Sequence, residues 1–355
     1  MSIQKILIYR LGSLGDSVVA LPCLHLIARA FPDSERRMLT NFPVSGKAAS
    51  MEAVIGGSGL VHGYFKYPLG TRSLRELWTL RQEIHRWAPE LLVYLVEPRG
   101  KISVYRDALF FTSCGIRKIV GVPYSAKLRK HRVFDEEGRF ESEANRLARC
   151  VRELGDAFVE RLESWDLRLN EAEKKAADEF LPGGQPLFIA AGVGTKMDIN
   201  DWGKDNWSDL LSSVSDRFPG LGLVMIGSED EKSKCEYVAA KWKGPRRNLC
   251  GLIPPRISAS VLKKSILFVG HDSGPMHLAA ACGVPCVAVF SARIEPGIWF
   301  PFGPGHQVIY HRTDCLGCCL EKCVEYKKKC IASITVEEVL DAVCEKLDRQ
   351  ATRII

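Results

Sequence analysis

The 355-residue sequence has no apolar run approaching the ~20 residues that a membrane-spanning helix requires. It also lacks the apolar stretch and small-residue cleavage site of a signal peptide, and its first ten residues are typical of a β-strand instead. We therefore expect a cytoplasmic protein whose 13 cysteines are mostly reduced, buried or metal-bound. With 46% hydrophobic and 26% charged residues, the composition excludes a disordered or fibrous chain.

Two common nucleotide-binding signatures are missing as well. The segment Arg10–Ser17 contains Gly12 and Gly15, but no third glycine completes the G-x-G-x-x-G fingerprint of dinucleotide-binding proteins. This segment also lacks the Gly-Lys-Ser/Thr sequence that marks a phosphate-binding P-loop. Neither motif therefore accounts for this glycine-containing turn.

What the sequence does contain is short apolar runs alternating with helical stretches, a pattern typical of a parallel sheet covered on both faces. A chain of this length normally forms two domains, and the Pro- and Gly-rich segment 181–186 marks the predicted junction. We expect an α/β fold of two doubly wound Rossmann-like domains, 1–180 and 181–355, with their ligand sites along a shared cleft. The predicted strands are Lys5–Tyr9, Arg37–Asn41, Leu91–Leu95, Lys118–Val122, Leu187–Ala191, Leu221–Ile226, Ile266–Val269 and Cys286–Phe290. The predicted helices are Ser17–Ala30, Ser73–Trp87, Glu171–Phe180, Asn206–Arg217, Glu231–Lys241, Ala259–Lys264, Met276–Cys282 and Val336–Leu347.

The net charge of +7 is unevenly distributed. Residues 1–170 hold 26 Lys and Arg against 19 Asp and Glu, whereas the remainder is balanced at 23 of each. Within the first half, segment 99–132 combines a single acid, Asp107, with nine bases. These are Arg99, Lys101, Arg106, Arg117, Lys118, Lys127, Arg129, Lys130 and Arg132. The segment is either a solvated face or a surface for an anionic partner such as phosphate, nucleic acid or an acidic membrane.

Candidate functional residues follow the first predicted strand. Gly12 and Gly15 permit a tight strand-to-helix turn with the backbone close to a ligand, and Arg10 and Ser13 lie on the same turn. Asp16 opens the next helix, where it serves either as an N-cap or as a general base within reach of a hydroxyl.

Two further turns follow strands of the second half. In the run 270–280, Asp272 and Ser273 lie on the turn, and the N–H groups of Ser273 and Gly274 suit a diphosphate. His277 either faces this site or packs inside the helix. The turn Gly194-Thr195-Lys196 is a candidate phosphate cradle, whereas the nearby Trp202 and Trp207 are predicted to be packing groups.

Five cysteines fall in segment 315–330, spaced Cys315-x2-Cys318-Cys319-x3-Cys323-x6-Cys330. Cys315, Cys318, Cys323 and Cys330 could supply four thiolates to a structural zinc or iron ion. Reduced structural thiols and a disulfide are the two alternatives.

Taken in order, these segments resemble glycosyltransferase family 9, which includes ADP-heptose:lipopolysaccharide heptosyltransferases. The resemblance rests on Arg10–Asp16 with Leu21-Pro22, Gly194–Trp202, Gly227–Glu231, Asp272–Ala280 and Val284-Pro285. It implies a GT-B fold, an inverting mechanism and no catalytic metal.

The resemblance also implies residue roles and partners. Asp16 matches the catalytic base, while Gly194, Thr195, Glu231, Asp272, Ser273, Gly274 and His277 match donor-binding positions. Lys196 or Lys204 matches the lysine on the donor diphosphate. The implied donor is ADP-heptose, and the implied acceptor is an anionic glycolipid of the lipopolysaccharide core, with peripheral contact to the inner membrane and no nucleic acid. The alternatives are glycosylation of a protein or another polysaccharide, and a non-catalytic nucleotide-sugar-binding protein.

Overall fold

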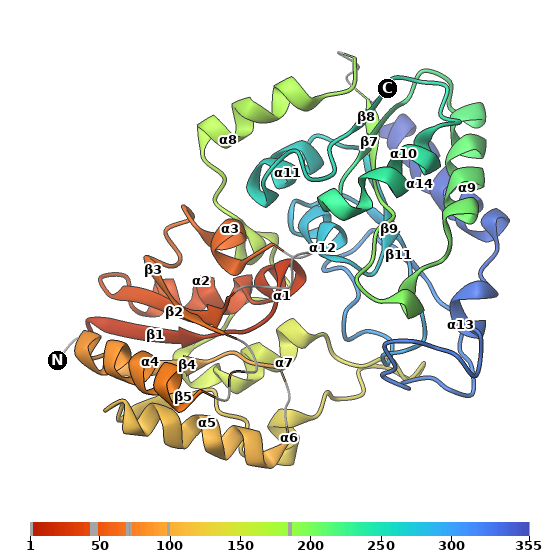
Figure 1. Cartoon of the computed structure of the whole chain (residues 1–355). Coiled ribbons are helices and arrows are strands. Elements are labelled where there is room, and N and C mark those ends of the chain that lie inside the picture. Colours follow the sequence, from red (N-terminus) through yellow and green to blue (C-terminus); the bar gives the residue numbers. More distant parts are fainter. Residues whose placement is uncertain are drawn as a thin grey trace. The chain divides into compact units, whose positions relative to one another are not determined.

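The computed structural model describes residues 3–42, 49–68, 71, 73–97, 100–183 and 187–354. By its internal contacts the chain divides into two compact units, Met1–Arg168 and Leu169–Ile355. Each unit contains a parallel sheet with helices packed around it (Figure 1). Among the described residues, no helix combines the length and apolar character needed to cross a bilayer.

The first unit has a sheet in the order β3-β2-β1-β4-β5, with every pair of neighbouring strands parallel. Its strands are β1 (Lys5–Tyr9), β2 (Glu35–Asn41), β3 (Gly63–Tyr67), β4 (Leu91–Tyr94) and β5 (Lys118–Val120). Its α-helices are α1 (Leu14–Val19), α2 (Leu21–Ala30), α3 (Met51–Ile55), α4 (Leu74–Trp87), α5 (Lys101–Ser113), α6 (Ala126–Arg129) and α7 (Glu143–Cys150). Short 3-10 helices follow at Arg152–Leu154 and Leu162–Trp165.

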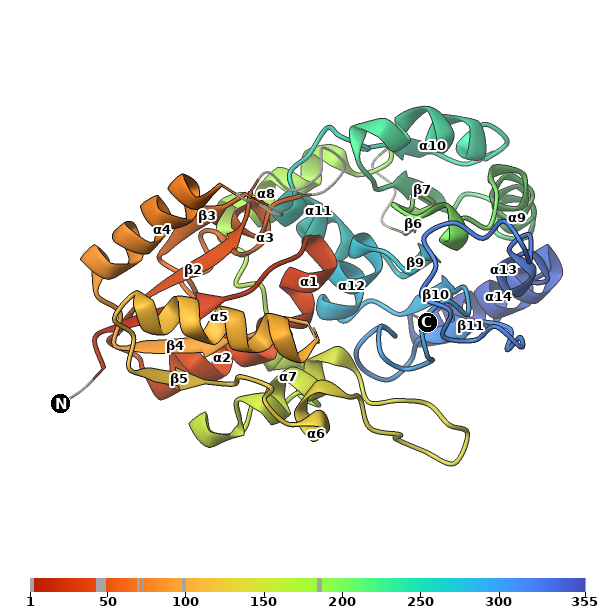
Figure 2. The same ribbon diagram turned by 60° about the horizontal axis from the view of Figure 1, so that its bottom comes forward.

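The sequence explains why this sheet is central. Strands β1 and β4 are apolar almost throughout and are buried on both faces, as expected of inner strands in a parallel sheet. Leu80 and Ile84 of α4 and Phe111 of α5 pack in one core cluster against one face of the sheet. In Figure 2, α5 runs alongside β4 and β5.

The second unit has a sheet in the order β11-β10-β9-β6-β7-β8, again with parallel neighbours. Its strands are β6 (Phe188–Gly192), β7 (Gly222–Met225), β8 (Arg246–Asn248), β9 (Leu267–His271), β10 (Cys286–Val289) and β11 (Gln307–Ile309). Its α-helices are α8 (Glu171–Ala176), α9 (Lys204–Arg217), α10 (Lys232–Ala239), α11 (Pro255–Leu262), α12 (Gly274–Ala281), α13 (Lys329–Ala332) and α14 (Val336–Ile354). The 3-10 helices are Ala177–Phe180, Asp198–Asn200 and Glu229–Glu231.

Both sheets have the doubly wound strand order. The chain starts at an inner strand, builds outward to one side, and then returns to place β4 beside β1 and β9 beside β6. The predicted α/β class is therefore confirmed, and each sheet has a switch point where the strand order reverses. Ligand sites in such sheets lie at the carboxyl ends of the strands next to this point.

The predicted boundaries agree best with the structure for the apolar inner strands. Strands β3, β8 and β11 were not predicted, because they are short and partly or largely exposed at their positions toward the sheet edges. Helix α5 was not predicted either, because Ile102, Tyr105 and Leu109 place apolar side chains on the exposed side of that helix and obscure its periodicity.

The division between the units also differs from the predicted junction after residue 180. Helix α8 belongs to the second unit because Arg256 of α11 binds Glu173 through two hydrogen bonds of 2.5 and 2.9 Å. Lys264 pairs with Asp178 nearby. These ion pairs hold the segment before the Pro- and Gly-rich linker against α11.

Candidate active site

The polar residues singled out from the sequence lie at the two switch points. Arg10–Asp16 follows β1, and Gly194–Lys196 and Asp272–Ser273 follow the paired strands β6 and β9. Each group therefore occupies the position where a doubly wound sheet binds its ligand.

Asp16 is held in place by the turn that precedes it. Its carboxylate accepts a 2.7 Å hydrogen bond from the Ser13 backbone N–H, and Oδ1 lies 3.4 Å from the Arg10 guanidinium. Ser13, not Asp16, is the N-cap of α1, which begins at Leu14. Asp16 is therefore not the N-cap itself, but its carboxylate does help to cap α1, because it bonds back to the N-cap residue from the first turn in a capping box.

Gly12 explains why this turn needs glycine. Its φ of +133° is unfavourable for other residues, and a Cβ at this position would lie 2.2 Å from the Asp16 Cγ. The Gly12 N–H donates a 2.7 Å hydrogen bond to the side chain of Asn41 at the end of β2. The carboxylate of Asp16 therefore packs directly over the backbone of the turn.

Beneath Asp16 lies a group of buried charges that the sequence analysis did not identify. Arg10 is fully buried and donates to the carbonyls of Leu95, at 2.7 Å, and Asp16, at 3.0 Å. Arg146 of α7 binds Glu143 through hydrogen bonds of 2.6 and 2.7 Å. Burial opposes ionisation of Glu143, but these bonds and the Arg10 and Arg146 charges hold its pKa at about 2.

In the second unit, the structure brings together two predicted donor-binding residues. A Cβ at Gly194 would lie 1.9 Å from the Glu231 carboxyl carbon, so this carboxylate rests on the Gly194 backbone. Its Oε2 also accepts a 2.8 Å hydrogen bond from the Ser228 N–H. Gly194 is thus the residue that makes room for a carboxylate at the carboxyl end of β6.

The turn after β9 carries the other predicted donor-binding residues. Ser273 is the N-cap of α12, and its buried hydroxyl has no hydrogen-bond partner within the part of the chain that the structure describes. His277 is buried, with Nε2 4.0 Å from Asp272 and its ring edge-on to Trp299. His277 is therefore packed inside the unit, and its role toward a ligand stays a prediction.

His271 is a positioning residue that the sequence analysis missed. Its Nε2 accepts hydrogen bonds from the Trp202 backbone N–H, at 3.0 Å, and the Trp207 indole, at 3.1 Å. Burial lowers the pKa of His271 to about 3, so the ring is neutral and can accept both bonds. Its position at the end of β9, one residue before Asp272, was the available signal.

The lysines of this region occupy different surroundings. Lys196 is exposed on the turn after β6, whereas the Lys204 ammonium lies 4.4 Å from the centre of the Tyr237 ring. Lys234, which the sequence analysis did not single out, pairs with Asp201 at 2.8 Å. Of the two lysines predicted for the diphosphate, Lys196 is the one on the glycine turn.

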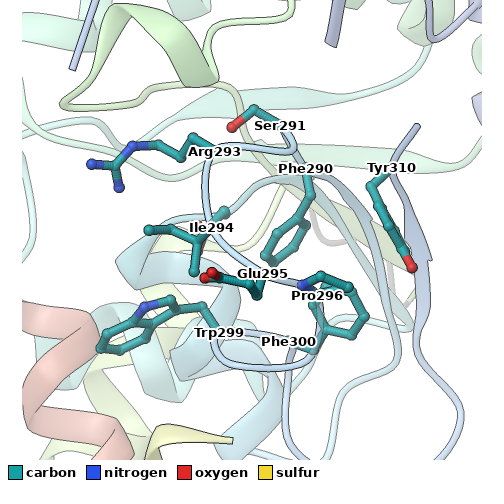
Figure 3. Close-up of a pocket in the computed structure, with 10 residues that line it drawn as sticks. Phe290, Ser291, Arg293, Ile294, Glu295, Pro296, Trp299, Phe300 and Tyr310 are labelled. Atoms are coloured by element: carbon teal, nitrogen blue, oxygen red, sulfur yellow. The ribbon is translucent and has the colours of Figure 1, made fainter. Parts of the chain in front are cut away.

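A pocket lies beside Asp272, between β10 and the following loop (Figure 3). Phe290, Phe300 and Tyr310 form one aromatic side of it. The ring centre of Phe300 lies 5.2 Å from that of Phe290, edge-on, and 5.6 Å from that of Tyr310. Arg293 and Glu295 supply charged groups to the lining.

The cysteine-rich segment packs against this pocket. The N–H groups of Gly317 and Cys319 donate to the carbonyls of Ala292 and Arg293 at 2.9 Å, and the Arg293 side chain donates to the Leu320 carbonyl at 2.8 Å. Cys330 is buried in the core of the second unit, whereas Cys318 is only half-buried. The described residues contain no group of three or more His, Cys, Asp or Glu side chains placed to hold a metal ion. The described residues therefore do not bring Cys315, Cys318, Cys323 and Cys330 together as the predicted site requires, and Cys330 lies in the hydrophobic core.

The basic segment does not form a single patch. Arg99 lies outside the described residues. Arg117 and Lys118 lie at the amino end of β5, away from the carboxyl ends of the strands. Arg129 donates hydrogen bonds to the carbonyls of Pro123 and Tyr124. The remaining bases lie on or near α5 and α6: Lys101, Arg106, Lys127, Lys130 and Arg132.

Two doubly wound units with polar turns at their switch points constitute the GT-B architecture of glycosyltransferases. The profile of glycosyltransferase family 9 (heptosyltransferase) matches residues 105–329, and the chain belongs to this family. The family and the enzyme class, glycosyltransferase, are therefore as predicted from the motifs.

Solved structures share the fold at low identity. A family 9 glycosyltransferase from Veillonella parvula DSM 2008 has a TM-score of 0.72 at 16% identity, over 98% of each chain. The E. coli ADP-heptose LPS heptosyltransferase II has a TM-score of 0.69 at 17% identity, over 98% of this chain and 100% of its own. The iron-containing dodecameric glycosyltransferase TibC from enterotoxigenic E. coli H10407 has a TM-score of 0.56 at 12% identity, over 99% of this chain and 77% of its own. Among curated proteins, no sequence matches the chain.

Proposed function

We propose that this glycosyltransferase moves a heptose from ADP-heptose to a hydroxyl of a lipopolysaccharide core, with inversion at the anomeric carbon. The observation that carries the proposal is the contact between Gly194 and Glu231 at one switch point, beside the α12 N-terminus. A helix N-terminus offers backbone donors and a positive dipole to a diphosphate, and a fixed carboxylate can bind ribose hydroxyls. The E. coli ADP-heptose LPS heptosyltransferase II, whose name specifies this donor and acceptor, supports the choice.

Asp16 is the proposed base. Its carboxylate takes the proton from the acceptor hydroxyl as that oxygen bonds to the anomeric carbon, and the bond from this carbon to the diphosphate oxygen breaks. The leaving ADP carries the bonding electron pair. Lys196 and the N–H groups of Ser273 and Gly274 offset the charge that accumulates on the diphosphate.

Replacing the base tests this assignment directly. Asp16→Asn should abolish transfer yet bind ADP as tightly as the unaltered enzyme, because Asp16 and the proposed ADP contacts belong to different units. Asp33→Asn, an exposed carboxylate substitution in the same unit, is the matched control and should transfer normally. An Asp16→Asn enzyme with unchanged turnover would exclude Asp16 as the base.

The donor can be identified separately from the acceptor. Thermal shift with ADP, UDP, GDP and their sugars should show the largest rise in melting temperature for ADP and ADP-heptose, since ligand binding to the folded state stabilises it. A larger rise with UDP or GDP would rule out the adenine nucleotide. We also propose that no catalytic metal is needed, so treatment with EDTA should leave the transfer rate unchanged.

The acceptor is proposed to reach the enzyme at the cytoplasmic face of the inner membrane. On α5, Ile102, Tyr105 and Leu109 are 86%, 54% and 71% exposed and share one stripe of the helix. Tyr124 extends this apolar stripe, with its ring centre 5.4 Å from that of Tyr105. We call these four residues the α5 face.

Three exposed bases lie near the α5 face in the chain. Lys101 lies at its start on α5, and the exposed Lys127 and Lys130 follow Tyr124 in the chain. Exposed apolar and aromatic side chains bordered by bases suit the interface of an anionic bilayer, where each base contributes about 1 kcal/mol. This arrangement favours membrane contact over nucleic acid for the basic segment.

Vesicle sedimentation tests the α5 face. Binding to vesicles containing anionic lipid should weaken as salt rises and should be lost in Ile102→Ser/Leu109→Ser. Val324→Ser removes an equally exposed apolar side chain in the second unit and should leave binding unchanged. Vesicle binding that changes neither with salt nor with the double substitution would refute the proposal that this surface contacts the membrane.

A further inference from the structure

A second carboxyl group, Glu97, lies against the proposed base. Glu97 follows β4 as Asp16 follows β1, and these strands are paired in parallel, with Tyr9 opposite Tyr94. Glu97 and Asp16 thus both lie at the switch point of the first sheet, and their carboxyl groups are close enough to interact.

The backbone before Glu97 is fixed by the two buried arginines. Arg10 donates to the Leu95 carbonyl at 2.7 Å, and Arg146 donates to the Val96 carbonyl at 2.9 Å. Arg10 also contacts Asp16 through both its carbonyl and its carboxylate. The same guanidinium thus positions the base and the chain segment that carries Glu97.

We propose that Glu97 is a positioning residue that carries a proton and donates a hydrogen bond to the Asp16 carboxylate. A hydrogen bond between two carboxyls requires a proton on one of them. Asp16 is the better choice for the ionised partner, because Arg10 and the Ser13 N–H already bind its oxygens. This extends the function proposed above: Glu97 keeps Asp16 charged and aligned toward the acceptor hydroxyl.

The charges around Glu97 agree with this assignment. Burial and the Asp16 charge raise the pKa of Glu97 to about 7, and Glu143 acts in the same direction, whereas Arg10 opposes it. Arg146 also faces Glu97 from α7. Both guanidiniums are already engaged with Asp16 and Glu143, and these two carboxylates neutralise the two arginine charges. A third carboxylate charge would be unpaired, so Glu97 takes the proton.

Stability measured against pH tests the proton without any substrate. A carboxyl whose pKa is raised on folding destabilises the folded state as pH rises from its unfolded pKa toward its folded pKa. Glu97→Gln keeps the donor and cannot ionise, so its melting temperature should exceed that of the unaltered protein at pH 8 but not at pH 5. Glu90→Gln, which replaces a carboxylate at the amino end of β4, should show no such pH-dependent gain.

A titration and a rate profile complete the test. In protein labelled with 13C at glutamate carboxyls, the Glu97 signal should titrate near pH 7, and at lower pH in Asp16→Asn, where the like charge is absent. Transfer should fall as pH rises through this range, and Glu97→Gln should abolish that decline. A Glu97 signal that titrates in the ordinary range of a glutamate overturns the proposal. If Asp16→Asn retains transfer, the proposed base fails instead, whatever the Glu97 titration shows.

Discussion

Substituting Gly194 by alanine separates the stability of the second unit from its proposed nucleotide binding. The alanine Cβ would overlap the Glu231 carboxyl carbon at 1.9 Å, well inside the distance of ordinary van der Waals contact. On its other side the carboxylate lies over Gly227, where an added Cβ would lie 2.4 Å from its Oε2, so the side chain is held between two glycine backbones. We expect the Glu231 side chain to swing out of the site toward solvent.

The two effects should differ in size. The folded state loses the hydrogen bond from the Ser228 N–H to Glu231, but water replaces the partner of both the N–H and the displaced carboxylate, so the net cost is about 1 kcal/mol. ADP loses a hydrogen bond to a charged group, which contributes about 1.5–3 kcal/mol and corresponds to roughly a 10- to 150-fold weaker Kd. Gly194→Ala should therefore remain folded and bind ADP poorly.

Calorimetric titration with ADP and urea unfolding measure the two quantities. Gly100→Ala is the matched control, since its Cβ would meet no atom within 4 Å and its φ is not positive. Glu231→Gln should reproduce the loss of affinity without the steric conflict. Full ADP affinity in both Gly194→Ala and Glu231→Gln would show that Glu231 does not contact the nucleotide, and the proposed donor site would be refuted.

Three further substitutions test the second unit by urea unfolding. Trp207→Phe should cost about 2–4 kcal/mol, because the fully buried indole leaves a cavity and the His271 ring loses one of two donors, and a cost below about 1 kcal/mol would contradict both contributions. Because folding lowers the pKa of His271 to about 3, the free energy of unfolding should fall as the pH drops from 6.5 toward 3, by up to about 1.4 kcal/mol per pH unit. His271→Gln should reduce this pH dependence. An unchanged dependence would contradict the burial of a neutral ring. Arg256→Met should cost about 2 kcal/mol because Glu173 loses both hydrogen bonds, and Arg256→Met/Glu173→Gln should recover part of this cost. Equal stability of the single and double variants would exclude that pairing.

Features that depend on residues close together in the chain could be predicted from the sequence. Strand β1 was predicted with its observed limits because Lys5–Tyr9 is apolar after its first residue and buried on both faces, and the turn that carries Asp16 follows it in the chain. The glycine at position 194 and the acid at position 231 were also predicted for one site from the motifs. Their direct contact depends on β6 and β7 being neighbours.

What escaped prediction depends on contacts distant in sequence. Arg10 meets Leu95 and Glu143 only after β1 pairs with β4 and α7 packs below them. Glu97 shows no motif of its own, and only the strand order shows that it shares a switch point with Asp16. The cysteine spacing suggested a metal site because spacing alone does not reveal that Cys330 joins the hydrophobic core.

The buried arginine pair also limits how this site can change during evolution. Arg10 uses its planar guanidinium to reach two carbonyls and a carboxylate, an arrangement that the single ammonium of lysine cannot reproduce. Losing one partner of such a buried ion pair costs about 3–5 kcal/mol, a large part of a typical domain's stability. Positions 10, 143 and 146 should therefore vary together across related sequences, and a lineage that abandons the base at position 16 should show compensating changes among them.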